Sequence, residues 1–409
     1  MNSNILQTSH FITWILTSTF YAFQMILRVM PVIMLDYLAR KVGLNASQLG
    51  LLAGVYYIGY CIAHIPIGIM LDRLQPRCII AGCILICVAG LYLTSFATST
   101  FEIFFARFLI GIGSAASILG SIKVITDFYR SIFGIMLGLT ILIGICGAYY
   151  GAEPIRIMLT HLSYEQVIEG LILFGIMLAA SIFAFYSRKV ASVEKSPIMD
   201  SLKLAMKNHK IWYIGICAGL MVGPLEGFAD LWGSNYLVQI HNITSSQGTF
   251  SVSLIFIGLG IGCPLFGYLS NHIDSSTRMI SYLGVLMLVT LIILFGLGSL
   301  STSIIYVLCF IIGLLSAYQI LAFTVINKLV TATNISISMA LLNMIIMIFG
   351  FIYHSLIGFI LDTFFISSTT DALVYGADAY QAAFSVILVG IIIGSVGFWR
   401  VEDDIRIYK

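Results

Sequence analysis

The chain has 409 residues, of which 60% are hydrophobic and only 9% are charged, and its formal net charge is +2. Soluble domains carry about 25% charged residues, so this composition excludes an ordinary water-soluble protein and indicates one that lies in a lipid bilayer. The small net charge does not indicate a nucleic-acid partner, and none is expected.

Twelve apolar runs follow one another along the chain, each long enough to cross a bilayer as a helix of about 20 residues. The first begins near Phe11, has no basic region before it and is too long for the core of a signal peptide, so we interpret it as a membrane span. The runs cover residues 10–38, 47–71, 78–97, 101–126, 131–153, 166–187, 210–238, 247–270, 278–298, 302–326, 333–362 and 379–400. The sequence therefore predicts an all-α, multi-pass membrane protein with twelve transmembrane helices.

The lysines and arginines gather on one side of these spans. With both termini inside, fourteen of them lie in internal segments, three in external segments and three at membrane depth. Because cytoplasmic loops are enriched in Lys and Arg, we expect both termini in the cytoplasm. The isoleucine-rich composition favours a bacterial inner membrane.

The longest polar segment divides the spans into two sets of six. We expect a six-helix bundle over 1–190, a cytoplasmic linker over 191–209 and a second six-helix bundle over 210–409. The halves resemble each other, since "FLIGIGSA" at 108–115 in span four recurs as "FIIGLLSA" at 310–317 in span ten. Two six-helix repeats predict a two-bundle transporter with its site near the membrane midplane.

A charged motif joins spans two and three. The segment "GIMLDRLQPR" places Gly68, Asp72, Arg73 and Arg77 in the spacing G-x-x-x-D-R-x-x-x-R, which resembles the signature of the major facilitator superfamily. The resemblance implies two pseudo-symmetric bundles that alternate access, with this cluster helping to close the cytoplasmic side. Asp127, near the cytoplasmic end of span four, is expected to pair with Arg77 in this gate.

Span one carries an arginine in an apolar run. The segment "MILRVMPVIMLDYL", which contains Arg28, resembles the first helix of the organic-anion branch of the superfamily, where an arginine binds the substrate anion. A planar guanidinium suits this role because it meets a carboxylate or phosphate in two parallel hydrogen bonds. The alternatives are a structural ion pair with an acid of span seven or four, or a side chain that snorkels to the surface.

Span seven carries two acids, Glu226 and Asp230, which lie four residues apart and therefore share one helix face. Phosphate-ester antiporters of the superfamily carry a second arginine where Glu226 stands. Arg28 together with Glu226 suits a zwitterionic solute, with Arg28 on its carboxylate and Glu226 on its amine. A low-dielectric cavity disfavours the charged form of such a carboxylate and so suits it to proton coupling. A permanent ion pair of Glu226 with Arg28 or Lys123 is the structural alternative.

Arg107 begins "RFLIGIG", which resembles the family's fourth-helix motif of an arginine followed by spaced glycines. In the family this arginine is linked to proton coupling or gating. The alternative is a structural role at the start of the span.

Further polar groups lie in the spans, and ordinary packing is the alternative for each. Candidate substrate-binding residues are Tyr57, Tyr318, Gln319 and Asn343, while the intramembrane His64 and His354 are structural by default, with a proton relay as the alternative. The eight cysteines are interpreted as buried free thiols, and neither a metal site nor a cofactor is expected.

The predicted function is uptake of a small carboxylate-bearing organic solute, such as an amino acid or short peptide, by a monomeric, lipid-embedded transporter with H⁺ symport. No phosphate-binding loop is present, so an ion or solute gradient supplies the energy and no enzyme activity is expected. The alternatives are an efflux antiporter for drugs or a siderophore, and a receptor without transport. The glycine repeat of span five lacks the Gly-Pro pair of drug antiporters, which counts against efflux.

Overall fold

A computed structural model describes residues 3–42, 46–151, 153–187, 198–270, 272, 275–330, 335–363, 367–369 and 372–406. The chain divides into two compact units. Unit 1 comprises Met1–Gly43, Val55–Ile211 and Ile326–Met344, and unit 2 comprises Leu44–Gly54, Trp212–Val325 and Ile345–Lys409. The predicted linker lies partly outside the described residues, and its remainder contains a short helix.

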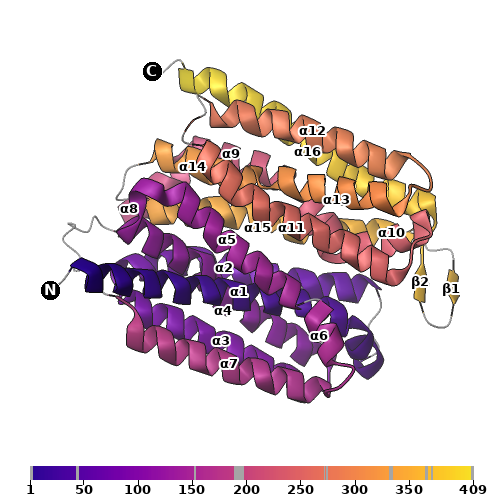
Figure 1. Ribbon diagram of the computed structural model, residues 1–409, viewed down its shortest axis with the longest axis horizontal. Coiled ribbons are helices and arrows are strands. Elements are labelled where there is room, and N and C mark those ends of the chain that lie inside the picture. The colour runs from indigo at the N-terminus through magenta and orange to yellow at the C-terminus, as the bar shows by residue number, and fades with distance from the viewer. Residues whose placement is uncertain are drawn as a thin grey trace. The chain divides into compact units, whose positions relative to one another are not determined.

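Every regular element among the described residues of unit 1 is a helix. Its elements are α1 (Ser3–Val42), α2 (Ala46–Arg73), α3 (Pro76–Phe96), α4 (Thr100–Phe128), η1 (Arg130–Ile132), α5 (Phe133–Gly151), α6 (Glu153–Met158), α7 (Tyr164–Phe185) and α8 (Ile198–Lys207). Helix α3 packs between α4 and α7, and α1 packs on α4 and α5 (Figure 1). A buried hydrogen bond of 2.9 Å from Trp14 Nε1 to Thr140 Oγ1 joins α1 to α5, as polar contacts commonly do between membrane helices.

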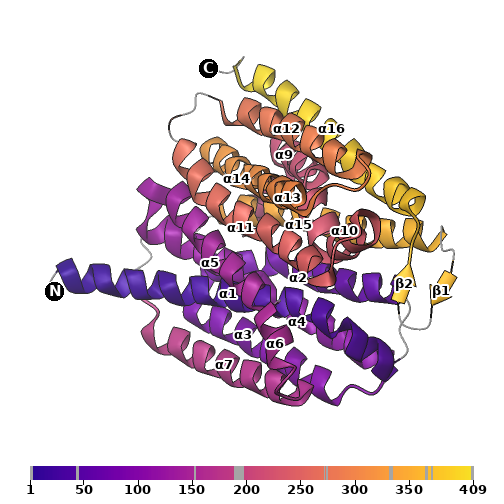
Figure 2. The ribbon, with the colours of Figure 1, turned by 45° about the vertical axis from the view of Figure 1, so that its right-hand side comes forward.

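Unit 2 contains the remaining helices and one short hairpin. Its elements are α9 (His209–Leu220), η2 (Pro224–Trp232), α10 (Gly233–His241), α11 (Ser245–Leu269), α12 (Ser276–Gly296), α13 (Thr302–Ser316), α14 (Tyr318–Leu329), α15 (Ile335–Thr363), β1 (Ser367–Thr369), β2 (Ala372–Val374) and α16 (Ala377–Arg406). Helices α2, α9, α14 and α15 each have residues in both units. Helix α12 lies beside α16, as Figure 2 shows, and α11 lies beside α13.

Apolar length determines most of these helices. Eleven helical segments of the described chain are long and apolar enough to cross a membrane, counting 209–241 as one. Helix α1, of 40 residues, occupies the place of the first predicted span. The predicted runs therefore correspond in chain order to α1 and these eleven segments, some of which contain more than one helix.

Three helices begin with the same capping arrangement of polar side chains. At the starts of α4, α7 and α11, a Ser or Thr side chain accepts the backbone N–H three residues later, and the Glu or Gln there accepts the cap's own N–H. The pairs are Ser99 with Glu102, Ser163 with Gln166, and Thr244 with Gln247. These capping boxes satisfy backbone donors that would otherwise lack partners where the chain turns back into the next span.

Each unit contains, within itself, the same kind of close helix contact at a glycine. In unit 1, a Cβ added at Gly111 of α4 would collide with the backbone carbonyl of Tyr56 in α2. In unit 2, a Cβ at Gly313 of α13 would collide with the carbonyl of Ile255 in α11. Gly111 and Gly313 are the matching glycines of the repeated segments 108–115 and 310–317. Each unit therefore uses its copy of the repeat to bring two backbones into contact.

Candidate functional site

Arg107 fixes the backbone of α1 in unit 1. Its guanidinium donates to the carbonyl of Leu27 at 2.5 Å and to the carbonyl of Arg28 at 2.8 Å, and the side chain is only 6% exposed. The same guanidinium lies 4.7 Å from the centre of the Tyr56 ring. Arg107 is therefore held inside unit 1 and positions the turn of α1 that carries Arg28. Its predicted part in proton coupling stays a prediction.

Arg28 lies beside aromatic rings of α2. The side chain is 7% exposed, and its guanidinium carbon lies 5.4 Å from the centre of the Tyr57 ring, a cation–π distance. One turn earlier on α1, Gln24 Nε2 donates to the Tyr56 hydroxyl at 2.5 Å. The predicted binding residues Arg28 and Tyr57 are thus neighbours, in a part of unit 1 rich in tyrosine and amide groups.

A second polar cluster continues along α2. Asn343 Nδ2 donates to the Tyr60 hydroxyl at 3.1 Å and lies 2.8 Å from His64 Nε2. The other ring nitrogen of His64, Nδ1, lies 3.3 Å from the Tyr60 carbonyl, so both ring nitrogens have a polar neighbour. His64 is therefore a hydrogen-bonded member of the cluster that contains the predicted residue Asn343.

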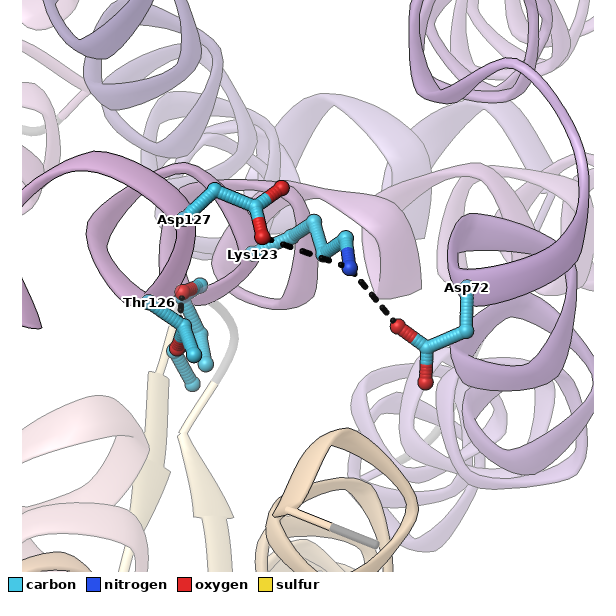
Figure 3. A network of polar contacts seen from close by, with 5 residues as sticks. Asp72, Lys123, Thr126 and Asp127 are labelled. Carbon is cyan, nitrogen blue, oxygen red and sulfur yellow. Dashed lines mark hydrogen bonds and ion pairs between the residues drawn. The ribbon is translucent and has the colours of Figure 1, made fainter. Parts of the chain in front are cut away.

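The charged motif forms a network with Lys123 at its centre. Lys123 Nζ lies 3.1 Å from a carboxylate oxygen of Asp72 and 3.6 Å from one of Asp127, as Figure 3 shows. Sequence reasoning joined Asp127 to Arg77 and left the role of Lys123 open. Arg77 donates to the Gln75 side chain at 3.2 Å and lies 4.9 Å from the centre of the Phe183 ring.

The other two motif residues lie on α2 in unit 1. Gly68 faces α15, since a Cβ placed there would lie 3.2 Å from the Cβ of Ala340. Arg73, which is half-buried, is the last residue of α2. The motif thus spans the end of α2 and the turn into α3, where its charged groups meet the end of α4.

Span seven is broken within unit 2. Helix α9 ends at Leu220, and after a short gap the chain continues as the π-helix η2 from Pro224 before α10 begins. Proline lacks a backbone N–H and so interrupts the hydrogen-bond ladder. Two carbonyls at the break accept side-chain hydroxyls, since Tyr318 donates to Ala218 at 2.6 Å and Tyr353 donates to Leu220 at 2.7 Å. The Ala218 carbonyl also accepts the backbone N–H of Met221 at 3.2 Å.

The predicted binding residues of span ten lie next to this break. Tyr318 is fully buried, and its hydroxyl proton is used by the carbonyl of Ala218. Gln319 is half-buried, and its Nε2 makes no hydrogen bond within the described part of the chain. The Tyr318 hydroxyl therefore has a hydrogen-bond partner within the protein, and its predicted binding role stays a prediction.

The two acids of span seven lie with a histidine that sequence reasoning did not connect to them. Glu226 is 1% exposed, and Asp230 Oδ2 lies 3.4 Å from Nε2 of His354, which is fully buried on α15. Ligand atoms of all three residues lie within 4.8 Å of one another. The i, i+4 spacing predicted the shared face of the acids, but no sequence signal pointed from η2 to a position so far along the chain.

The predicted residues divide between the units. Unit 1 contains Arg28, Tyr57, Arg107, Asn343 and the charged motif, whereas unit 2 contains Glu226, Asp230, Tyr318 and Gln319. Each unit thus combines buried ionic groups with tyrosine hydroxyls at membrane depth. Such groups are costly in hydrocarbon and mark solute or ion pathways in membrane proteins.

A family model described as Major Facilitator Superfamily matches residues 13–354. The chain belongs to the major facilitator superfamily. The resemblance inferred from the charged motif is confirmed, and with it the class of protein, a multi-pass membrane transporter of small molecules rather than an enzyme.

Solved structures agree with this assignment at the level of the fold. A bacterial homologue of the human lysosomal transporter Spinster, inward-facing and unoccupied, is 14% identical with a TM-score of 0.70, covering 95% of this chain and 96% of its own. The fucose:proton symporter FucP of E. coli is 15% identical with a TM-score of 0.67, covering 95% and 98%. The human organic anion transporter MFSD10 is 14% identical with a TM-score of 0.69, covering 96% and 98%. The predicted all-α fold of twelve transmembrane helices is confirmed.

A comparison with curated proteins found no match. Identities near 15% show the shared fold and leave the solute to be inferred from this chain's own residues.

Proposed function

We propose that this transporter takes up a small organic solute that carries a carboxylate, such as an amino acid or short peptide, by symport with H⁺. The observation that carries the proposal is the buried guanidinium of Arg28 against the ring of Tyr57. The arrangement supports anion binding because a guanidinium presents a planar fork of donors to a carboxylate.

The surroundings of Arg28 favour a solute with an organic body over a bare inorganic anion. Tyr57 offers an aromatic face, and Gln24, Tyr56 and Asn343 place hydroxyl and amide groups in the same unit. Arg107 holds the backbone of the site by donating hydrogen bonds to the carbonyls of residues 27 and 28. We infer that the solute's carboxylate meets Arg28 and that its body packs against tyrosine.

The coupling proton is assigned to unit 2. Glu226 and Asp230 are carboxylates at membrane depth, and an acid in that environment can take up and release H⁺ during a transport cycle. A fucose:proton symporter among the proteins of similar fold supports proton coupling as a mode available to this architecture. Tyr318 and Gln319 complete the set of proposed binding residues.

Uptake into proteoliposomes tests the anion site. With a panel of radiolabelled amino acids and dipeptides, Arg28→Ala is expected to abolish uptake, and Arg28→Lys to raise KM by about tenfold or more. Lysine keeps the charge but loses the second parallel hydrogen bond, a contact worth about 1.5–3 kcal/mol. The matched control is Arg130→Ala, since Arg130 is an exposed arginine of the same unit. Normal uptake by both Arg28 variants would reject the site.

Coupling is tested separately with Glu226→Gln. An inward H⁺ gradient is expected to drive wild-type uptake against a solute gradient and to lose this effect in the variant, while exchange of labelled for unlabelled solute continues. Uptake by the wild type that ignores both the gradient and an uncoupler would reject H⁺ symport.

A further inference from the structure

The three side chains gathered at the break in span seven combine two kinds of metal-binding donor. We propose that Glu226, Asp230 and His354 form a binding site for a divalent transition-metal ion of the Zn²⁺, Mn²⁺ or Co²⁺ class. The proposal goes beyond the transport of a carboxylate solute and does not depend on it. It also departs from the expectation, drawn from sequence alone, that the chain holds no metal site.

The spacing of the donors fits one ion. Two ligands of a tetrahedral ion, each about 2.1 Å from it, lie about 3.4 Å apart. His354 Nε2 and Asp230 Oδ2 are 3.4 Å apart, which is longer than the roughly 2.7–2.9 Å of a charge-assisted hydrogen bond. A carboxylate oxygen of Glu226 lies within 4.8 Å of a ligand atom of each of the other two residues, so side-chain rotation can bring it into the same coordination sphere.

The donor set indicates which ions bind. Mg²⁺ and Ca²⁺ prefer shells made of oxygen alone, whereas an imidazole nitrogen with carboxylates suits first-row transition metals and zinc. Two ionised carboxylates and a dication form a neutral group, which lowers the cost of keeping these charges in a buried, membrane-spanning part of the fold. A dication therefore matches both the chemistry and the charge of the cluster.

The backbone holds the donors in place. A Cβ added at Gly227, between the two acids, would lie 3.0 Å from Ile357 Cδ1 and 3.2 Å from Tyr353 Cβ. These residues flank His354 on α15, so the missing side chain at Gly227 allows η2 and α15 to approach at the level of the imidazole. The bond from Tyr353 to the Leu220 carbonyl anchors the same turn of α15 to the end of α9.

Three protein ligands leave at least one coordination position open. Structural zinc sites are closed by four protein ligands, whereas a site with three keeps a position for water or another small ligand. We therefore assign an exchangeable ion to this cluster rather than one that is locked in during folding.

The test is zinc binding by the full-length protein in detergent after removal of metal with a chelator. Equilibrium dialysis with Zn²⁺ is expected to give one tight site per chain. His354→Gln and Asp230→Asn are each expected to weaken that site by at least about tenfold, since even the loss of outer-shell partners costs 10–100-fold. Matched controls in the same unit are His272→Gln, an exposed histidine, and Asp362→Asn, an acid elsewhere on α15. The proposal is overturned if folded variants bind Zn²⁺ as tightly as the wild type.

A measurement on the wild type keeps the test decisive where a variant fails to fold. X-ray absorption at the zinc edge is expected to show an imidazole ligand together with oxygen ligands, and a shell of oxygen alone would reject the site. The metal site shares Glu226 and Asp230 with the proposed proton coupling, whereas the anion site at Arg28 is separate from it. Arg28-dependent solute uptake by vesicles kept free of metal therefore tests the anion site independently of the metal site.

Discussion

Arg28 and Arg107 are neighbouring buried arginines of unit 1, and their contacts distinguish them. Arg107 uses its donors on two carbonyls of α1, whereas Arg28 lies along the ring of Tyr57. A guanidinium bonded to backbone carbonyls stabilises the helix that accepts those bonds, because each is a charge-assisted hydrogen bond in a low-dielectric setting. Arg107 therefore determines where Arg28 stands along α1.

Lys123 is the residue of the charged network whose loss is expected to matter most. It lies between the carboxylates of Asp72 and Asp127, so Lys123→Gln leaves two acids close together without the cation between them. We expect a loss of about 1–2 kcal/mol in the free energy of unfolding and a lower Tm in detergent. Thermal melting followed by tryptophan fluorescence measures it.

The exposed Lys207 on α8 supplies the control for this change. Lys207→Gln removes the same charge at the surface and is expected to leave Tm unchanged. Adding Asp72→Asn to Lys123→Gln is expected to recover part of the loss, since one uncompensated carboxylate is then removed. Equal melting of the Lys123 and Lys207 variants would contradict the importance of the network.

At the scale of the element, the glycine contacts give a prediction with built-in controls. Gly111→Ala and Gly313→Ala each place a methyl group against a backbone carbonyl, which cannot rotate away as a side chain can. We expect each to cost about 1–3 kcal/mol as the helices are forced apart. Thermal melting and the yield of monodisperse protein measure the loss.

Gly82 and Gly296 serve as controls for these two sites. A Cβ at either position meets nothing within 4 Å, so alanine there adds helix propensity without a collision. Gly82→Ala and Gly296→Ala should therefore melt at or above the temperature of the wild type. Alanine tolerated equally at all four positions would show that the helices do not need this close approach.

Sequence patterns predicted which segments are helices better than they predicted how those helices are interrupted. Hydropathy measures apolar length, so it located the spans in chain order. Hydropathy does not show that span seven is broken, a break at which tyrosines from two other helices donate to its carbonyls. The break between α13 and α14, the helix α8 and the hairpin of β1 and β2 were not predicted either, because apolar length does not indicate such features.

Pairs of site residues were predictable only within one helix. Glu226 and Asp230 lie four residues apart, and so do Lys123 and Asp127. Lys123 and Asp127 form an ion pair in the structure. The contacts of Asp72 with Lys123, and of Asp230 with His354, join different helices and depend on how each is rotated about its axis. Hydropathy carries little information about that rotation, because apolar residues surround these helices on most sides.

At the scale of the whole molecule, the family assignment and the positive-inside bias make the topology testable. With twelve spans and fourteen of twenty Lys and Arg in the segments on one side, both termini are expected in the cytoplasm. Green fluorescent protein fused to either end should fluoresce in bacterial cells, and alkaline phosphatase fused there should be inactive. Active phosphatase at the carboxyl end would reverse the assigned orientation.

The hydroxyls that cap the broken span have a consequence for how a solute is received. Tyr318 and Tyr353 donate to the Ala218 and Leu220 carbonyls within the protein itself, so the break in span seven is present before a solute binds. The free energy of solute binding is then not consumed in breaking the helix of span seven. Replacing both tyrosines by phenylalanine removes these two hydroxyl donors and is expected to loosen the break.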